Sequence, residues 1–374
     1  MSAMFRLRVS RLVAGAGART LTGMELKKLN ISRCCLITGP KTGSTGYCRE
    51  VVKSVEAEGI EVSVWKGVDR EPDEEIFSDC LDFVRNEEPD AVVAFGGGSV
   101  LDTAKIVNAC YCLGRDLRFF LTPSSQLARF RLKPFIAIPT TFGTGSETTC
   151  ASVLKVDGVK RGILHESLLP DTAILDWEIK APERVAASAG MDAVMHAFEA
   201  YTCLESDRVE SGFYSGSNEV TDSLALRALE LLSNLPDYVK RGEHAREVAV
   251  GSNVAGMAFG NAGVHFGHAA SYAIAALTGK PHGECVASVG QALLEWIEEN
   301  ISRERAEDVR KALGRNIDDV RREAGTPSLS EMGLGIDDVP ELVKRTMEVK
   351  RLIAMRPEID EKAAREIFER ALSF

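Results

Sequence analysis

The chain has 374 residues, of which 45% are hydrophobic and 27% charged, with a formal net charge of −10 and a sequence pI near 5.3. This negative balance argues against a nucleic-acid or anionic-membrane partner, because a polyanion would be repelled over most of the surface. The composition is that of an ordinary globular protein, and the length exceeds the size at which one hydrophobic core keeps growing, so we expect two domains.

The nine cysteines contain no Cys-x-x-Cys pair and are odd in number. This pattern indicates reduced thiols and predicts a cytoplasmic location. No apolar run approaches the roughly 20 residues that span a bilayer.

The first twenty residues carry four arginines and no acidic residue, a composition similar to that of a mitochondrial transit peptide. Residues 5–15, however, alternate apolar and polar side chains with the period of two that is typical of a half-buried strand. We therefore favour a strand of the folded protein at this end of the chain.

Short apolar runs then alternate with helical patterns from residue 32 to about residue 177. Strand patterns occupy residues 33–39, 61–67, 90–99 and 134–141, and helical patterns occupy residues 45–59, 73–88 and 100–112. This succession predicts βαβ units, which form a mainly parallel sheet with helices on both faces.

Helical periodicity dominates the rest of the chain. We therefore expect an α/β nucleotide-binding domain at residues 1–177 and a helical domain at residues 178–374. A cleft between two such domains is a common place for a ligand.

Two segments rich in small residues follow predicted strands, at the sheet edge where open α/β proteins bind ligands. Glycines let the backbone approach a phosphate group closely, and free N–H groups at a helix start face the negative charge. The first segment contains Gly96, Gly97, Gly98 and Ser99, followed by Asp102, which could bond a ribose or cap the helix. The second contains Thr140, Thr141, Gly143, Thr144, Gly145 and Ser146. Neither segment matches GxGxxG or a Walker loop, so each alone is a weak signal.

Asp192 and His196 lie four residues apart in a strongly helical stretch. This spacing places both side chains on one helix face, close enough to share a metal ion, although a surface Asp–His hydrogen bond would have the same spacing.

Three of the six histidines, His265, His268 and His282, fall within one later window, and His282 lies in a Pro-His-Gly turn. A carboxylate with imidazoles suits Fe(II) or Zn(II) rather than Mg or Ca. Residue types alone leave His265 and His268 as equal candidates. His165 and His244 lie in polar segments, and we expect them to be exposed.

Five segments occur in the order shown by the iron-containing (group III) alcohol dehydrogenases, a family that the chain resembles from about residue 5 to its C-terminus. They are GGGSVLDTAK, IPTTFGTGSETT, PDTAILDWEI, GMDAVMHAFEAYT and HAASYAIAALTGKPHGE. The resemblance implies a Rossmann-like dinucleotide-binding domain and an all-α C-terminal domain, the fold shared with dehydroquinate synthase, and a divalent metal.

The family's ligands are an Asp, a His four residues later, and two histidines fourteen residues apart. The resemblance therefore implies Asp192, His196, His268 and His282 as ligands and excludes His265. Many members carry a further His near the nicotinamide where this chain has Tyr272, which is a poor base at neutral pH because its ordinary pKa is near 10. The wording around residues 260–272 is closer to the hydroxyacid–oxoacid transhydrogenase branch, whose cofactor stays bound.

Members that prefer NAD tend to carry Asp where this chain has Gly39. A carboxylate there repels a 2′-phosphate, whereas Lys41 could pair with one, so we predict that NADP(H) is favoured over NAD(H). Lys160 matches a family lysine near the cofactor, but a solvated lysine in a turn fits equally well.

We therefore expect a metal-dependent NAD(P)-linked alcohol dehydrogenase or aldehyde reductase, with iron favoured and zinc possible. The ion binds the substrate oxygen, and the nicotinamide gives or takes hydride. The partner is a small alcohol or aldehyde in a pocket that includes Phe142 and Phe259, and the protein is a homo-oligomer, a dimer or larger. The transhydrogenase is the main alternative. Three further alternatives are less favoured. The Asp-x-x-x-His pair argues against a metal-dependent lyase that resembles dehydroquinate synthase, and the full four-ligand pattern argues against a glycerol-type zinc dehydrogenase. A nucleotide-binding scaffold that has lost its activity would be expected to lack one or more ligands, and all four are present.

Overall fold

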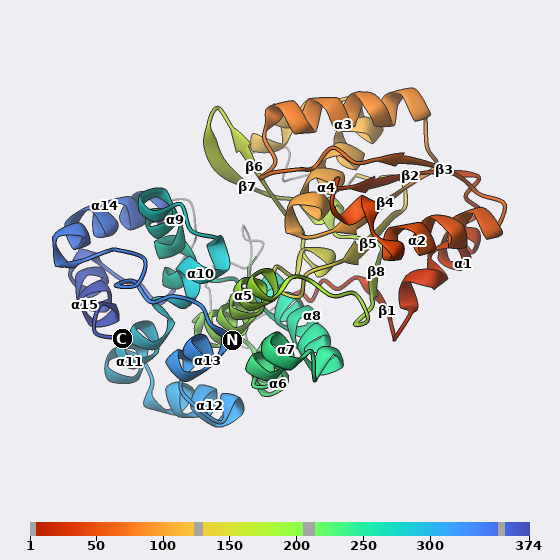
Figure 1. The fold of residues 1–374 in the computed structure, drawn as a ribbon. Helices are drawn as coiled ribbons and strands as arrows, with labels where there is room; N and C mark the ends of the chain where they lie inside the picture. Colours follow the sequence, from red (N-terminus) through yellow and green to blue (C-terminus); the bar gives the residue numbers. More distant parts are fainter. Residues whose placement is uncertain (1–4, 123–129, 205–213, 351–355) are drawn as a thin grey trace. The chain divides into compact units, whose positions relative to one another are not determined.

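The protein was analysed as a computed structural model that describes residues 5–122, 130–204, 214–350 and 356–374. The chain divides into two compact units. The sheet unit comprises Arg8–Thr141 and Ser146–Lys180, and the helical unit comprises Met1–Leu7, Phe142–Gly145 and Ala181–Phe374. Figure 1 shows the strands gathered in one unit and helices making up the other.

The sheet unit is built on six parallel strands in the order β1-β8-β5-β4-β2-β3. Their bounds are β1 Arg11–Ala14, β2 Arg33–Thr38, β3 Glu61–Trp65, β4 Ala91–Gly96, β5 Phe135–Pro139 and β8 Thr172–Leu175. The helices between them are α1 Thr22–Lys27, α2 Gly46–Ala57, α3 Glu74–Glu87 and α4 Gly98–Leu113. The predicted α/β class with a parallel sheet is confirmed.

Alternate residues of the central strands enter two different cores. Cys35, Val92 and Ala137 pack with apolar residues of α3 and α4, while Leu36 and Val93 pack with apolar residues of α1 and α2. Helices therefore cover both faces of the sheet, and the central strands are buried on both sides.

A hairpin that the sequence patterns did not predict forms a separate two-stranded sheet. It consists of β6 Ala151–Val156 and β7 Val159–Leu164, paired antiparallel. The turn residues Asp157 and Gly158 both have positive φ, at 53° and 73°. An Asp-Gly pair between two strand-like runs is a strong hairpin signal, so this element could have been predicted.

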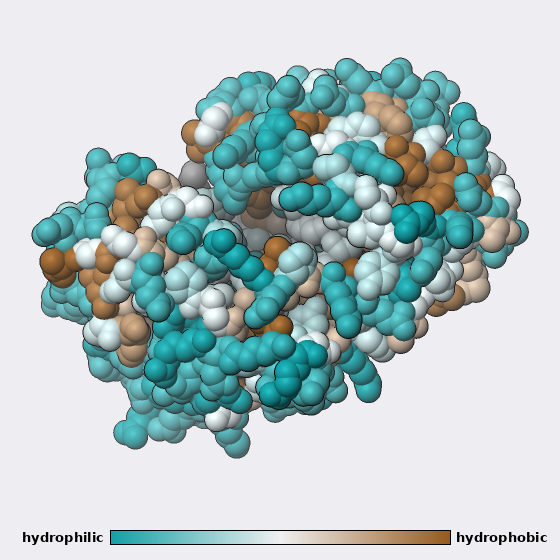
Figure 2. Space-filling view, viewed as in Figure 1, coloured by the Kyte–Doolittle hydropathy of each residue, from teal (hydrophilic) through white to brown (hydrophobic). Residues whose placement is uncertain are grey.

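The helical unit contains helices of six to twenty residues. Its helices among the described residues are α5 Glu183–Thr202, α6 Glu219–Leu232, α7 Leu235–Arg241, α8 Ala245–Ala262, α9 Phe266–Thr278, α10 His282–Ala287, α11 Gly290–Asn300, α12 Arg303–Leu313, α13 Ile317–Ala324, α14 Val339–Lys350 and α15 Glu361–Ala371. The space-filling view shows mostly hydrophilic side chains over α3 and α12 (Figure 2). Within the described ranges, no helix combines the length and apolarity needed to cross a membrane.

Two details differ from the expected organisation. Only Arg11–Ala14 of the predicted N-terminal strand joins the sheet, and residues 1–4 lie outside the described part of the chain. The segment Phe142–Gly145 belongs to the helical unit, although it lies within residues 1–177, where we expected the α/β domain. The reason is close packing, since a Cβ on Gly143 would lie 2.3 Å from the backbone oxygen of Ala189.

Lys105 on α4 is a buried cation that holds the segment before the hairpin. Its Nζ donates to the backbone oxygens of Thr149 at 2.9 Å and Ala151 at 2.8 Å, and the residue is 2% exposed. Burial lowers the pKa of Lys105 to about 8, against the opposing influence of Asp102 and other nearby acidic groups.

This shift predicts how stability depends on pH. Because the folded-state pKa of about 8 lies below the ordinary 10.5, the folded protein binds fewer protons than the unfolded chain between these values. The free energy of unfolding of the wild type should therefore rise relative to that of Lys105→Met as the pH increases from about 8 towards 10. Urea unfolding of both proteins across this range measures the difference, and a difference independent of pH would contradict the shift.

Candidate metal centre

Helix α5 carries the first two candidate ligands on one face. Asp192 and His196 lie one helical turn apart, and their side chains are 5% and 7% exposed. The surrounding sequence, GMDAVMHAFEAY, is almost entirely buried, so the helix passes through the interior of its unit. Two polar side chains in such a helix require partners from neighbouring elements.

Helices α9 and α10 supply these partners. His268 lies in the first turn of α9, and His282 is the first residue of α10. The following residue, Gly283, lies directly against α5, where a Cβ would be 1.9 Å from the backbone oxygen of Ser188. The Pro-His-Gly turn can therefore bring His282 to the Asp192 carboxylate only because residue 283 has no side chain.

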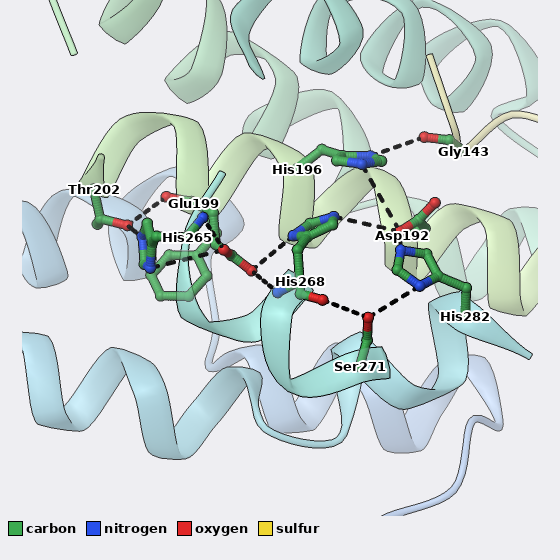
Figure 3. Close-up of polar contacts among 10 residues, drawn as sticks. Gly143, Asp192, His196, Glu199, Thr202, His265, His268, Ser271 and His282 are labelled. Carbon is green, nitrogen blue, oxygen red and sulfur yellow. Dashed lines mark hydrogen bonds and ion pairs between the residues drawn. The ribbon is translucent and has the colours of Figure 1, made fainter. Parts of the chain in front are cut away.

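The three imidazoles converge on one carboxylate oxygen (Figure 3). The Nε2 atoms of His196, His268 and His282 lie 4.0, 3.7 and 3.6 Å from Oδ1 of Asp192. These distances are too long for hydrogen bonds. Ligands that share one tetrahedral ion at about 2.1 Å are separated by roughly 3.4 Å, so the spacing suits a common metal ion.

The other nitrogen of each ring faces an acceptor. Nδ1 of His196 lies 3.2 Å from the backbone oxygen of Gly143, and Nδ1 of His268 lies 2.8 Å from Oε1 of Glu199. Nδ1 of His282 lies 3.0 Å from the Ser271 hydroxyl, which donates its own proton to the His268 backbone oxygen. In the neutral rings, each Nδ1 is therefore the protonated nitrogen, and each Nε2 lone pair is left to bind a metal.

Two buried polar atoms that lack hydrogen bonds among the described residues lie where the imidazoles converge, and this is the arrangement expected of a metal site. Asp192 Oδ1 and His268 Nε2 are inaccessible to solvent and make no hydrogen bond within the described parts of the chain. Asp192, His196 and His268 are close enough to bind one ion together, and His282 completes a set of three nitrogens and one oxygen. This donor set suits Fe(II) or Zn(II).

The ionisation behaviour of the site points in the same direction. The pKa of His196 falls to about 4 because of burial, whereas the carboxylates of Glu199 and Asp192 overcome burial and raise the pKa of His268 to about 9. Burial acts to raise the pKa of Asp192, but the three neighbouring histidines hold it below its ordinary value. Two buried carboxylates therefore favour positive charge at this point.

Aromatic rings border the site. Phe259 stacks on His196 with ring centroids 3.9 Å apart, and Tyr272 meets His282 edge to face at 6.0 Å. Phe142 instead packs against Tyr238 at 6.2 Å and is buried. The predicted position of Phe259 beside the ligands agrees with this geometry, whereas no ring contact joins Phe142 to the four ligands among the described residues.

The remaining histidines occupy three different environments. His265 is fully buried, and its Nε2 contacts the Thr202 hydroxyl at 2.8 Å rather than Asp192. His244 is exposed. The prediction that His165 is exposed is wrong: it is 2% exposed, because the rings of Phe120 and Phe130 pack against it. Its Nδ1 accepts a hydrogen bond from the backbone N–H of Ser167.

The first residues of the two small-residue segments lie side by side in the sheet unit. The backbone N–H of Thr140 donates to Gly96 at the end of the neighbouring strand, and α4 begins at Gly98 with Gly97 as its N-cap. Ser99 lies in the first turn of α4. The side chain of Thr141 lies next to Gly97, where a Cβ would be 3.2 Å from Oγ1 of Thr141. Thr144 lies in the segment that belongs to the helical unit.

Of the two roles considered for Asp102, a ribose contact or a helix cap, the cap does not form, because the residue lies beyond the first turn of α4. Its carboxylate accepts hydrogen bonds from Ser146 Oγ at 2.6 Å and from the backbone N–H of Val153 at 3.0 Å. Burial raises the pKa of Asp102 despite nearby Lys105. Lys160 forms an ion pair of 2.5 Å with Glu71, while Lys41 is exposed just after the buried Gly39.

Two polar residues of the centre were missed in the sequence. Glu199 follows Asp192 by seven residues and His196 by three, so the helical periodicity that relates the first pair also includes it. Ser271 lies three residues after His268 on α9. Helical spacing from a ligand is the signal that could have indicated both.

The chain matches the family models of known proteins over nearly its whole length. Residues 10–177 match the iron-containing alcohol dehydrogenase model, and residues 186–372 match the C-terminal model of the Fe-containing alcohol dehydrogenase family. The chain belongs to the iron-containing alcohol dehydrogenase family.

Several relatives in this family are similar over most of their length. A mitochondrial hydroxyacid-oxoacid transhydrogenase of Bos taurus is 30% identical, with 96% of this chain and 88% of that protein covered. An NAD-dependent methanol dehydrogenase of Bacillus methanolicus is also 30% identical, with coverages of 90% and 91%. The structure of an iron-containing alcohol dehydrogenase from Thermococcus thioreducens superposes with a TM-score of 0.85 at 28% identity, covering 99% and 100% of the two chains.

These comparisons overturn the predicted cytoplasmic location. The transhydrogenase relatives carry a mitochondrial location in their names, whereas the prediction rested on the reduced state of nine cysteines. The prediction is wrong because reduced thiols are compatible with more than one compartment.

The site predicts the outcome of removing one ligand. His268→Ala should weaken Zn(II) binding by more than the roughly 100-fold expected for loss of an outer-shell partner. His244→Asn is the matched control, because His244 is exposed and asparagine tolerates its positive φ of 56°. Competition with a chelating dye measures both affinities, and equal binding by wild type and His268→Ala would contradict the assignment.

Proposed function

We propose that this oxidoreductase transfers hydride between a nicotinamide cofactor and a small alcohol or carbonyl substrate at a divalent metal, iron being favoured. The observation that carries the proposal is the convergence of three Nε2 atoms on one buried oxygen of Asp192. A bound ion would act as a Lewis acid towards the substrate oxygen, and the nicotinamide would supply or accept the hydride.

The chain's own groups hold and shield this centre. Gly143, Glu199 and Ser271 keep the Nδ1 protons of the three imidazoles in place, so the Nε2 atoms need no reorganisation. Phe259 covers one face of His196, and burial of the first three ligands excludes water from them. His282 is the most exposed ligand, with 32% of its side chain accessible, and Tyr272 lies beside it. We therefore expect substrate to approach on the His282 side.

Hydroxyacid–oxoacid transhydrogenation is a second candidate. It is supported by the relatives named for that reaction and by the Tyr272 position, where the dehydrogenases commonly have histidine. In this reaction a cofactor that stays bound takes hydride from a hydroxy acid and gives it to an oxo acid. In either case we expect a small-molecule partner and a homo-oligomer, a dimer or larger.

One assay separates the two candidates. Metal-free protein is reconstituted with Fe(II) or Zn(II), and the absorbance of NADPH or NADH is followed with small aldehydes and 2-oxo acids. Metal-dependent consumption of free cofactor that is lost in His268→Ala supports the dehydrogenase. Transfer between a hydroxy acid and an oxo acid without consumption of free cofactor supports the transhydrogenase, and no turnover with either metal contradicts both.

We also propose a preference for NADP(H). The first argument is steric. Gly39 is buried, and a Cβ there would lie 2.5 Å from the backbone oxygen of Val68, so an aspartate that would repel a 2′-phosphate does not fit without a backbone shift. The exposed Lys41 lies two residues later and suits a 2′-phosphate.

The preference is tested by Lys41→Ala. Loss of one charge-assisted contact should raise the KM for NADPH about tenfold and leave the KM for NADH nearly unchanged. Lys53→Ala is the control, since Lys53 is an exposed lysine on α2 of the same unit. Equal changes for both cofactors would contradict the proposed phosphate contact.

A further inference from the structure

Glu199 is a buried carboxylate on the same face of α5 as Asp192 and His196. It is 0% exposed, and its oxygens accept hydrogen bonds from His268 Nδ1 at 2.8 Å, from the His268 backbone N–H at 3.1 Å and from the His265 backbone N–H at 2.5 Å. Figure 3 shows Glu199 on the side of His268 opposite Asp192. One imidazole therefore lies between two carboxylates.

The contact with Nδ1 decides which nitrogen of His268 is free. An ionised carboxylate only accepts hydrogen bonds, so the ring must carry its proton on Nδ1. The Nε2 lone pair then faces Asp192 Oδ1, 3.7 Å away. Without the carboxylate, a neutral ring has no comparable reason to keep this tautomer, and the tautomer with Nε2 protonated cannot bind a metal through Nε2.

The two backbone contacts fix the start of helix α9, and so the position of the His268 backbone. His265 is the N-cap residue of α9, yet its own side chain makes no capping hydrogen bond. Glu199 supplies the missing acceptor from another helix and places negative charge at the positive end of α9. The same carboxylate thus holds both the backbone and the ring of His268.

Gly267 provides the space for this carboxylate. A Cβ on Gly267 would lie 2.3 Å from Glu199 Oε1, which is the oxygen that contacts Nδ1 of His268. The φ of Gly267 is not in the left-handed region, so alanine suits its backbone. Alanine would therefore push Glu199 away from His268 without removing any ligand.

We propose that Glu199 is a positioning residue of the metal centre, which sets the tautomer and the place of His268, and that Gly267 is present to admit it. The inference rests on the proposed function, because it assumes that Nε2 of His268 binds the metal. It goes beyond that function by making affinity for the metal depend on a residue that does not touch it.

The test is the affinity of the full-length protein for Zn(II) alone, measured by competition with a chelating dye in wild type, Glu199→Gln and Gly267→Ala. We expect 10- to 100-fold weaker binding in Glu199→Gln, the range typical of an outer-shell partner. We expect about tenfold weaker binding in Gly267→Ala, estimated from the lower end of that range.

Thermal unfolding of the metal-free proteins separates positioning from mere folding. Glutamine at 199 should lower the midpoint, since its NH2 group replaces one of the two oxygens that accept hydrogen bonds from the start of α9. Gly267→Ala keeps both carboxylate oxygens of Glu199, and alanine is a better helix former than glycine, so its midpoint should fall less than that of Glu199→Gln. The variant therefore keeps the inference testable if Glu199→Gln does not fold.

Thr202→Val is the matched control. Its hydroxyl contacts Nε2 of His265, on the other side of the cluster, and donates to the backbone oxygen of Phe198. We expect its Zn(II) affinity to stay within about twofold of wild type, because it leaves the contacts of Glu199 with His268 intact.

A Co(II) spectrum provides a second readout. If Glu199 orients His268, the visible absorption of the Co(II)-loaded protein should change in Gly267→Ala and remain unchanged in Thr202→Val. Equal Zn(II) affinities in wild type, Glu199→Gln and Gly267→Ala would overturn the inference and leave the proposed metal centre in place. A wild-type protein without affinity for Zn(II) or Co(II) would overturn both.

Discussion

The arrangement of the helical unit depends on one buried carboxylate oxygen, Oδ1 of Asp192, which has no hydrogen-bond partner in the part of the chain that the structure describes. Removing an ionised group from water is costly unless other groups compensate for it. Three helices meet this requirement by aiming His196, His268 and His282 at the same point. Their close approach explains why residue 283 is glycine.

Hydrogen-bond acceptors around the ligands orient the three imidazole rings. A backbone oxygen, a carboxylate and a hydroxyl each face the Nδ1 of one ring and accept a hydrogen bond from it. Three rings that could ligate through either nitrogen therefore all direct Nε2 towards Asp192. Rigid placement of this kind lets the protein bind a metal without reorganising its ligands.

The sheet unit uses buried polar groups for a different purpose. Asp102 and Lys105, both on α4, hold Ser146, Val153 and the backbone on either side of Cys150. These contacts tie the hairpin and the threonine-rich segment to the helix that starts at the glycine loop. A glycine-rich loop needs such support, because its own glycines provide little stiffness.

Periodicity in the sequence was sufficient to predict the parallel sheet, the helical second half and the spacing of Asp192 with His196, since these patterns depend on neighbours along the chain. It left His265 and His268 equivalent by type, and only resemblance to a family distinguished them. The roles of Glu199, Ser271 and Gly267 and the burial of His165 were decided by tertiary structure. A tautomer, a close approach or a buried position depends on which distant segments meet, and local sequence carries no direct record of those meetings.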